Sequence, residues 1–144
     1  MLRIKNDVLS KIAMAFRACD VEKGFLLGSN RDLTYINYCF DLPASDAGLH
    51  FYEPDPVCAD ETIRSWANQG VCFCGMIHSH VVDKQDLSVN DIAYAKALYS
   101  AYHLPVLWFG IGIVQASNVD FRFYSVSKSS EQINITLEEY QIEN

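Results

Sequence analysis

The sequence predicts an α/β fold in which a single mixed β-sheet is sandwiched by helices, within one domain that spans residues 1–144. Half of the residues are apolar and only 20% are charged, a composition typical of a chain that buries a core. A length of 144 residues is common for one domain. Helical and strand-like patterns are interspersed along the chain, which favours helices layered in two or three layers with one sheet.

The amino-terminal part is predicted to form a helix followed by two strands. Apolar residues recur at helical spacing over residues 7–18, and Asn6 or Asp7 is of the type that caps a helix. A dense apolar run between glycines predicts a buried strand over residues 21–29. Residues 33–40 continue the pattern, and we expect them to be its neighbour in the sheet.

The middle of the chain is predicted to form a surface loop and then a well-delimited helix. Residues 41–48 consist largely of turn-forming types, which favours a loop. Asp55, Pro56 and Gly70 then supply, in the right order, a helix cap, a first-turn proline and a terminating glycine. The pattern predicts a helix that ends at Asn68.

The remaining chain is predicted to contain four strands and one helix. The apolar run over residues 71–80 predicts a strand, and a serine-capped, alanine-rich segment predicts a helix over residues 88–101. Residues 106–115, 120–126 and 132–140 alternate in polarity, which predicts three more strands. The last is the most polar, and we expect it at a sheet edge.

Charge and cysteine content exclude several classes of protein. A net charge of −7 would repel phosphate backbones, which argues against nucleic acid as a partner. The longest apolar stretch, residues 104–114, is too short to cross a bilayer, and residues 1–7 lack the pattern of an export signal. No membrane partner is therefore expected. Five cysteines without an export signal predict reduced thiols and a cytoplasmic location.

A set of potential metal ligands lies at the end of the predicted strand over residues 71–80. His78 and His80 are two residues apart, so their side chains point to the same face of the strand. Asp91 falls in the first turn of the following helix and can complete a set of three ligands. Three protein ligands leave a fourth position open, the pattern of catalytic zinc, on which a bound water has a pKa near ~7.

Each part of this set also has a purely structural interpretation. A pair of histidines on one strand often packs or hydrogen-bonds inside a core. Ser88 and Asp91 are spaced as at the start of a capped helix, where an acid is favoured by the helix dipole. The occurrence of all four residues together, at these spacings, favours a metal site over chance.

The pattern His78-Ser79-His80, seven residues, Ser88, two residues, Asp91 resembles the motif of the JAMM/MPN (JAB domain) zinc metalloproteases. The order of predicted elements also resembles the domain of that family, so the likeness covers nearly the whole chain. It implies a cytidine-deaminase-like sheet architecture. The short chain is similar to the compact prokaryotic members.

An upstream glutamate strengthens this resemblance. The segment from Glu22 to Gly28 is similar to the setting of the family's glutamate, Glu-x-x-Gly-x-Leu-x-Gly. The resemblance implies that Glu22 is the general base and that Ser88 donates a hydrogen bond to the tetrahedral oxyanion. It also implies Zn²⁺ as the cofactor, with these metal ligands: His78, His80 and Asp91. Without the histidine motif, Glu22 would be interpreted as an exposed acid at a strand end.

The function implied by the resemblance is that of a zinc metallopeptidase or isopeptidase. It would cleave an amide bond at or near the C-terminal tail of a ubiquitin-like or sulfur-carrier protein, by attack of a zinc-bound water. An extended tail can add to a sheet edge, and residues 41–48 and the loop after His80 are expected to flank it. One alternative is a non-catalytic MPN-type scaffold that only binds partners. Another is a phage- or secretion-associated peptidase that acts on a structural protein.

Two further observations concern residues around the motif. The chain has Val81 and Leu87 where members of the family commonly have proline. Cys72, Cys74 and Met76 share the strand alternation of the histidines, which raises the possibility of a Cys–His metal site. Cys74 would lie over ~10 Å from the first histidine on an extended strand, so small buried core residues are the favoured interpretation of the cysteines.

Overall fold

The computed structural model describes residues 1–82 and 84–144. In chain order its elements are β1 (Leu2–Lys5), α1 (Asn6–Arg17), β2 (Gly24–Ser29), β3 (Tyr35–Ile36), β4 (Tyr38–Leu42), β5 (Ala44–Ala47), β6 (Tyr52–Pro54), α2 (Pro56–Asn68), β7 (Cys72–His80), α3 (Val89–Tyr102), β8 (Leu107–Val114), β9 (Val119–Ser129), β10 (Gln132–Glu138) and β11 (Tyr140–Glu143).

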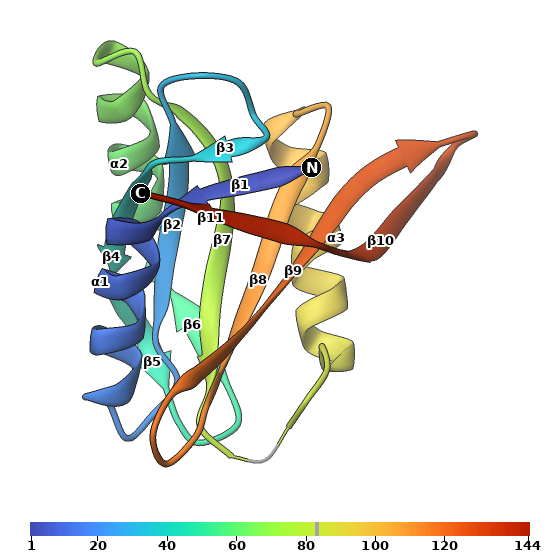
Figure 1. The fold of residues 1–144 in the computed structure, drawn as a ribbon. Helices are drawn as coiled ribbons and strands as arrows, with labels where there is room; N and C mark the ends of the chain where they lie inside the picture. The colour runs from blue at the N-terminus through green and yellow to red at the C-terminus, as the bar shows by residue number, and fades with distance from the viewer. Residues whose placement is uncertain (83) are drawn as a thin grey trace.

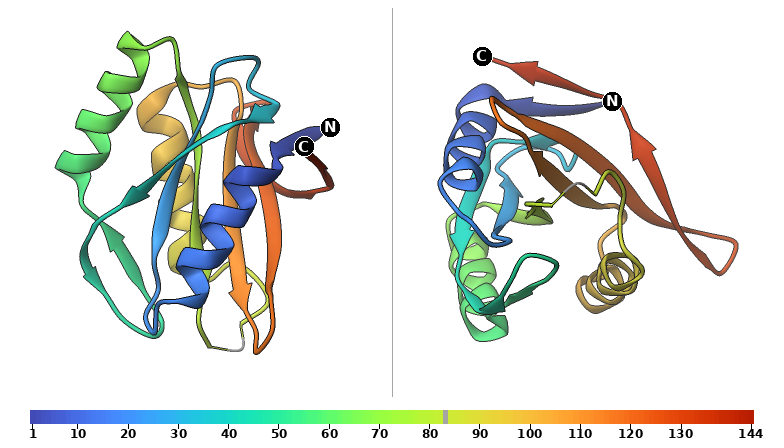
Figure 2. Two further views of the ribbon diagram at one scale, coloured as in Figure 1. Left: turned by 60° about the vertical axis from the view of Figure 1, so that its left-hand side comes forward. Right: turned by 90° about the horizontal axis from the view of Figure 1, so that it is seen from below.

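A six-stranded mixed sheet forms the centre of the molecule, in the order β10-β9-β8-β7-β2-β4. The strands β7 and β8 pair in parallel, and the other neighbours in this sheet pair antiparallel. Helix α1 covers one face, and α2 and α3 cover the other (Figures 1 and 2). The predicted α/β arrangement of a mixed sheet between helices is therefore confirmed, and β10 lies at a sheet edge as expected.

The prediction of a single sheet is wrong, because two smaller sheets accompany the central one. The strand β1 lies between β3 and β11 in a three-stranded sheet, so the first and last strands of the chain lie side by side (Figure 1). The strands β5 and β6 form a hairpin, so residues 41–48 are not a loop. Both sheets use short strands whose partners are not evident from local alternation.

The helix starts differ in how well the sequence predicted them. Helix α1 is preceded by Lys5 and has no side-chain cap, because the chain enters the helix directly from β1, so the predicted caps Asn6 and Asp7 are wrong. The cap of α2 is confirmed: the Asp55 carboxylate accepts hydrogen bonds from the backbone amides of the second and third helical residues. Gly70 follows that helix with φ +77°, as a terminating glycine requires.

Two hydrophobic cores, one on each face of the central sheet, hold the layers together. Residues of α1 and of the three-stranded sheet pack on one face, and residues of α2 and α3 pack on the other. Buried members of the first core include Leu2, Ile12, Phe16, Phe25, Ile77 and Phe123, and those of the second include Leu26, Trp66, Met76, Ala95 and Phe109. Burial of each large side chain contributes about 1.5–3 kcal/mol.

A register shift in the centre of the sheet changes which residues share a face. The ladder between β2 and β7 is irregular between Leu27 and Gly28. On β7, Phe73 and Met76 both pack on the α2/α3 face, whereas Cys74 packs on the α1 face. Strict alternation along the strand is therefore interrupted, because a bulge of this kind displaces one residue. The prediction that Cys74 shares a face with the histidines is wrong, which removes it as a ligand.

The cysteines and helices bear on two other expectations. All five cysteines are free thiols; Cys74 is buried, but Cys72 is exposed, contrary to the prediction of a core residue. Within the part of the chain that the structure describes, none of the helices combines the length and apolar character needed to cross a bilayer.

Gly75 allows β7 to approach β8 closely, and its replacement tests this packing. A Cβ atom at Gly75 would lie 2.0 Å from the Trp108 carbonyl oxygen, a backbone atom that cannot move independently. We expect Gly75→Ala to lower the free energy of unfolding by about 3 kcal/mol or more, measured by urea denaturation. Gly70→Ala is the matched control: it has open space and only backbone strain, and is expected to cost about 1 kcal/mol. Equal losses in the two variants would contradict this account.

Candidate metal centre

The two motif histidines lie side by side at the end of β7. His78 and His80 are 4% and 1% exposed, and their ring centroids are 5.0 Å apart. Their side chains share a face because the strand is regular after its bulge. The central strand β7 lies between β2 and β8, so the backbone that carries both imidazoles is hydrogen-bonded on both sides. The structure brings these predicted ligands together as expected.

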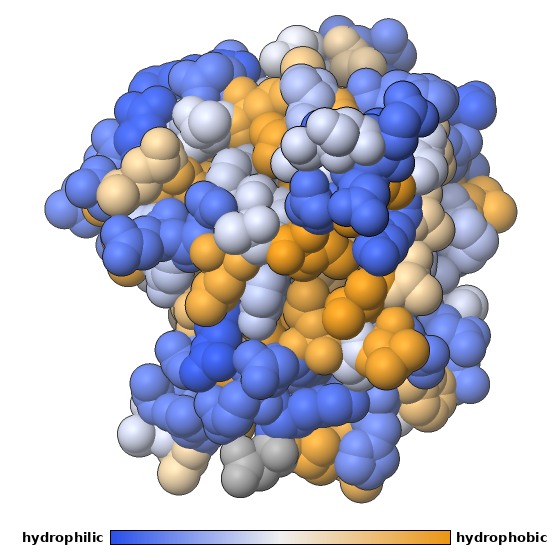
Figure 3. Space-filling model, turned by 90° about the vertical axis from the view of Figure 1, so that its right-hand side faces the viewer, coloured by the Kyte–Doolittle hydropathy of each residue, from blue (hydrophilic) through white to orange (hydrophobic). Residues whose placement is uncertain are grey.

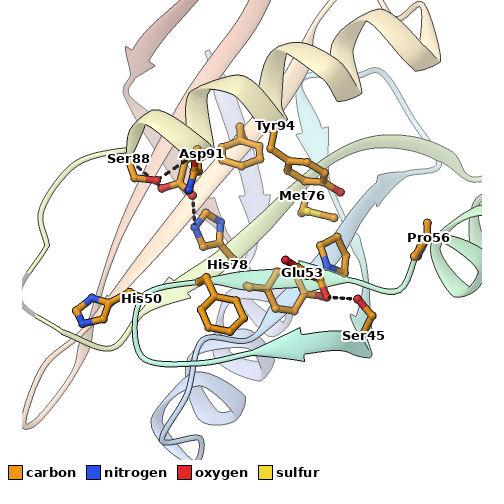
Figure 4. A pocket seen from close by; sticks show the side chains of 14 residues that line it. Ser45, His50, Glu53, Pro56, Met76, His78, Ser88, Asp91 and Tyr94 are labelled. Carbon is orange, nitrogen blue, oxygen red and sulfur yellow. Dashed lines mark hydrogen bonds and ion pairs between the residues drawn. The ribbon is translucent and has the colours of Figure 1, made fainter.

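A capping box fixes the third predicted ligand at the start of α3. The backbone amide of Asp91 donates to Ser88 Oγ at 3.0 Å, and the backbone amide of Ser88 donates to Asp91 Oδ2 at 2.9 Å. The Asp91 carboxylate therefore has a defined orientation before any ligand binds; it points at His78 (Figure 4) and also lies beside His80. The structural interpretation of these two residues as a helix cap is confirmed, and the same cap positions a candidate metal ligand.

The spacing of the three side chains fits a tetrahedral metal ion. His78 Nε2 lies 3.1 Å from Asp91 Oδ1, and His80 Nε2 lies 3.2 Å from Asp91 Oδ2. One ligand atom from each residue lies within 4.8 Å of the others. A tetrahedron with bonds of about 2.1 Å has ligand atoms about 3.4 Å apart. The two nitrogen–oxygen separations, each to a different oxygen of Asp91, are slightly below that value, so this set of donor atoms fits a zinc ion.

The hydrogen bonds of His80 require a positive charge at the site. His80 Nδ1 lies 3.0 Å from the carbonyl oxygen of Lys84, which can only accept, so Nδ1 carries a hydrogen. In a neutral ring, Nε2 then presents a lone pair to the carboxylate of Asp91, which is repulsive. A proton or a metal cation between the two atoms removes the repulsion. A histidine whose second nitrogen donates to a carbonyl is a common arrangement among metal ligands.

The other histidine has a buried nitrogen without a satisfactory partner. Among the described residues, His78 Nε2 has no hydrogen-bond partner of acceptable geometry, although it lies close to the Asp91 carboxylate. Its ring stacks on Tyr52, with centroids 6.5 Å apart and planes inclined by 8°, and it also contacts Phe109. An unsatisfied buried polar atom is costly. A metal ion would satisfy this nitrogen.

The protonation states of Asp91 and His80 depend on each other. Burial alone would raise the pKa of Asp91, but its contacts with His78 and His80 hold that pKa well below its usual range. Burial lowers the pKa of His80, but its hydrogen bonds to Asp91 and to the Lys84 carbonyl raise it more. These two directions favour a protonated His80 imidazole opposite an ionised Asp91 carboxylate in the metal-free protein. A metal ion would replace that proton.

Glu22 lies beside the ligands although it precedes β2. The Lys23 amide donates to Ser79 Oγ at 2.9 Å, and the Ser79 amide donates to the Lys23 carbonyl at 2.8 Å. These bonds extend the antiparallel pairing of β2 and β7, and the same register places Glu22 opposite His80. Glu22 is 4% exposed, so its interpretation as an exposed strand-end acid is wrong.

The environment of Glu22 gives it the properties of a general base. Burial raises its pKa from 4.5 to about 7, while the nearby charge of His80 opposes the shift. A carboxyl group with a pKa near neutrality can both accept and return a proton at physiological pH. The structure thus brings Glu22 close to the candidate metal ligands, as predicted.

Ser88 combines its cap with a free donor. Its oxygen accepts the Asp91 amide, which uses a lone pair and leaves the hydroxyl hydrogen available. Within the described part of the chain no residue accepts that hydrogen, and Ser88 lines a cavity next to the candidate metal ligands. Capping and hydrogen-bond donation to a ligand are therefore compatible.

Arg122 holds the segment that connects β7 to α3. Its guanidinium donates to the Gln85 carbonyl oxygen at 2.8 Å and to Gln85 Oε1 at 3.2 Å. It also lies 3.5 Å from Asp86 Oδ1 and 3.7 Å from Asp120 Oδ2. This segment contains Lys84, whose carbonyl oxygen orients His80. Residue 83 of the predicted loop 81–87 lies outside the described residues.

A cavity of about 530 Å³ opens directly onto the ligands. It lies between α3 and the β5–β6 hairpin, and its floor is formed by β7 and β8 (Figure 4). Its size is typical of a site that binds a peptide segment or a small molecule. The residues that line it are Ser45, His50, Phe51, Tyr52, Glu53, Pro54, Pro56, Met76, His78, Ser88, Asn90, Asp91, Tyr94 and Phe109.

A second, shallower cavity of about 360 Å³ lies between α3 and β10, away from the ligands. Figure 3 shows apolar side chains gathered over this face of the molecule. The apolar residues around the cavity are Leu87, Ile92, Ile133 and Ile135, with Asp86 and Lys96 among the polar ones. It contains no residue of the metal centre.

The sequence did not identify several residues that shape the site. Phe51 and Tyr52 lie in a stretch for which no element was predicted, and Tyr94 and Phe109 lie in a predicted helix and a predicted strand without a pattern that marks them as part of a site. The glycine at position 24 is the one local feature that relates to Tyr52. A Cβ atom at Gly24 would lie 2.5 Å from the Tyr52 ring, so the absence of a side chain there leaves room for Tyr52. The clamp formed by Arg122 depends on long-range packing and leaves no local pattern.

Comparison with known proteins supports the fold. No protein-family model and no curated protein matches the chain. The solution structure of a protein from Desulfitobacterium hafniense is similar, with a TM-score of 0.74 and 18% identity over 99% of this chain and 93% of that one. A solution structure from Salinibacter ruber has a TM-score of 0.61 and 14% identity, over 99% and 92% of the two chains. At such identities the likeness shows the fold alone.

Zinc binding is the first property that this geometry predicts. Zinc at about a hundredfold excess over its Kd stabilises a folded protein by about 2.7 kcal/mol, which corresponds to a rise of roughly 5–10 °C in Tm for a chain of this size. We expect this rise for the chelator-treated protein on addition of zinc, measured by calorimetry. His80→Asn should abolish it, because the imidazole nitrogen that would bind zinc is lost, together with the ring N–H that donates to the Lys84 carbonyl oxygen. His103→Asn, outside the site, should retain it. An equal rise in both variants would exclude the proposed ligands.

The raised pKa of Glu22 predicts how stability depends on pH in the metal-free protein. Between about pH 4.5 and 7 the folded state binds more protons than the unfolded state, so the free energy of unfolding falls as pH rises through this window. Glu22→Gln removes this term. We expect the variant to gain on the order of 2 kcal/mol relative to wild type between about pH 4.5 and pH 8, measured by urea denaturation with chelator. If the free energies of unfolding of the two proteins changed in parallel with pH, Glu22 would not lie in a desolvated site.

Proposed function

We propose that the chain is a zinc-dependent peptidase or isopeptidase of the JAMM/MPN type. The observation that carries the proposal is the convergence of two buried imidazoles and one carboxylate, with a buried glutamate beside them. The hydrogen bond from His80 Nδ1 to a carbonyl oxygen supports a cation at this place. Three protein ligands leave a coordination position for water or substrate, which favours a catalytic over a structural zinc.

Zinc bound there would polarise a substrate carbonyl and lower the pKa of a water to about 7. Glu22 accepts a proton from the attacking water while the water oxygen forms a bond to the carbonyl carbon. Glu22 then returns the proton to the nitrogen as the C–N bond breaks, so that water is consumed and a carboxylic acid and an amine are formed. Ser88 donates its free hydroxyl hydrogen to the oxygen that becomes negatively charged.

The proposed substrate follows from the family resemblance and from the cavity, not from the reaction itself. The resemblance to the JAMM/MPN family supports cleavage at or near the C-terminal tail of a ubiquitin-like or sulfur-carrier protein. The cavity between α3 and the β5–β6 hairpin is compatible with an extended segment of such a chain. The alternative is a scaffold that binds partners without catalysis. The buried Glu22 with its raised pKa argues against a scaffold, because carboxyl groups with strongly shifted pKa values are concentrated at catalytic sites.

Substitution of the base separates metal binding from catalysis. Glu22→Gln should retain zinc, because the side chain is not a ligand, and should lower kcat on a ubiquitin-like protein with a C-terminal extension by at least about 100-fold. His78→Ala should lose both zinc and activity. Zinc is measured by elemental analysis and hydrolysis by mass spectrometry of the products.

The control for the base is Glu61→Gln, since Glu61 is exposed on α2 and lies outside the site. It should keep both zinc and activity. Hydrolysis by the Glu22→Gln protein at the wild-type rate would contradict the assignment of the base. A wild-type protein with stoichiometric zinc that cleaves no such substrate would favour the scaffold.

A further inference from the structure

The segment that joins β7 to α3 carries the oxygen atom that orients a candidate metal ligand. The Lys84 carbonyl oxygen lies 3.0 Å from His80 Nδ1 and accepts its hydrogen. With Nδ1 engaged in this way, Nε2 of the same ring is directed at the Asp91 carboxylate, 3.2 Å away. The direction of the lone pair that would bind zinc therefore depends on where the Lys84 carbonyl lies.

This segment has little stiffness of its own. Residues 81–87 contain no proline, so no side-chain ring restricts their backbone dihedral angles. Residues 81, 82 and 84–87 belong to no helix or strand. Leu87 packs on the buried cluster of Ile111, Ile113 and Tyr124, which anchors the end of the segment next to α3. The position of the Lys84 carbonyl must therefore depend on contacts between the segment and the rest of the protein.

The register of the central sheet brings Arg122 to this segment. His78 on β7 pairs with Ile111 on β8, and Ile111 pairs with Arg122 on β9. Residues that are paired across neighbouring strands point to the same face of a sheet. The Arg122 side chain therefore lies on the face that carries the candidate ligands, two strands away from His78 and level with it.

Arg122 holds the backbone next to the Lys84 carbonyl. Its guanidinium donates to the Gln85 carbonyl oxygen at 2.8 Å and to Gln85 Oε1 at 3.2 Å. The Lys84 and Gln85 carbonyl groups belong to consecutive residues, so a displacement of one moves the other. Asp86 and Asp120, at 3.5 and 3.7 Å, contact the guanidinium in turn.

A surface ion pair is the simpler interpretation of Arg122. Its side chain is 30% exposed, and ion pairs with carboxylates as exposed as that of Asp86 contribute little to stability. The two interpretations predict opposite effects on zinc. A nearby positive charge repels a cation, so the loss of Arg122 as a charge would tighten zinc binding. The loss of Arg122 as a support for the backbone would weaken it.

We propose that Arg122 is a positioning residue of the metal centre, which acts on His80 through the backbone of Lys84 and Gln85 and raises the affinity for zinc. Arg122 itself contacts neither metal nor substrate. Without it, the His80 ring would have to be reoriented as zinc binds, which lowers the affinity. The inference rests on the zinc site of the proposed function and not on the peptidase reaction.

The test measures the zinc affinity of each metal-free protein by competition with a chelator of known affinity. Arg122→Lys keeps the positive charge but loses the planar fork that donates to both oxygens of Gln85, and Arg122→Ala loses charge and donors together. We expect zinc to bind about 10-fold or more weakly to both variants. Lys128→Ala is the matched control, because it removes an exposed cation further along β9, and it should bind zinc as the wild type does.

A second measurement follows the link between Arg122 and the ligand. In the zinc-loaded wild type and in Lys128→Ala, the His80 Nδ1 proton is held by the Lys84 carbonyl and should give a slowly exchanging NMR signal. In Arg122→Lys, exchange with water should weaken this signal, because its acceptor is less firmly held. Circular dichroism with chelator verifies that each variant is folded, which separates a loss of zinc affinity from a loss of structure.

The outcomes distinguish this inference from the function on which it rests. Weaker zinc binding by Arg122→Lys, together with a zinc-loaded wild type that hydrolyses no substrate, would support the inference and refute the peptidase. Unchanged or tighter zinc binding by Arg122→Lys and Arg122→Ala would overturn the inference and leave the peptidase standing. An equally protected His80 Nδ1 proton in Arg122→Lys and the wild type would also overturn it. A wild type that binds no zinc would refute both.

Discussion

The opposition of one carboxylate and two buried imidazoles is the constraint on which the site depends. Asp91 faces His78 and His80 at 3.1 and 3.2 Å, in a place largely closed to water. Because the Lys84 carbonyl fixes a hydrogen on the far nitrogen of His80, the near nitrogen can only meet the carboxylate through a positive charge. The end of β7 and the start of α3 are therefore coupled through whatever cation lies between them, and metal binding and local stability are linked.

The sheet topology explains why several segments can contribute to this place. The strands β7 and β8 are the parallel pair of the central sheet, and the chain leaves β7 to begin α3 at the same end. Side chains at the carboxyl end of β7 and at the amino end of α3 therefore meet. The antiparallel neighbour β2 brings Glu22 to that end from the other side. The candidate base, the candidate ligands and the cavity thus come from five separate parts of the sequence: residues 22, 45–56, 76–80, 88–94 and 109.

Local patterns predicted much of this arrangement, and long-range packing accounts for the rest. The α2 cap at Asp55, the Ser88 capping box and the paired histidines depend on neighbours within a few residues, so their sequence spacing predicts them. The pairing of β1 with β11 joins the two ends of the chain, and the β5–β6 hairpin uses short strands rich in turn-forming residues. Neither has a local pattern. The side on which Cys74 packs depends on a bulge set by contacts with β2, which alternation alone does not reveal.

The most direct test of this account is a crystal structure of the protein grown with zinc, with diffraction measured on both sides of the zinc absorption edge. The account predicts one strong anomalous peak about 2.0–2.2 Å from His78 Nε2, His80 Nε2 and an Asp91 carboxylate oxygen, with no fourth protein ligand. A map without a peak between these three side chains, or a structure in which they point away from one another, would contradict it.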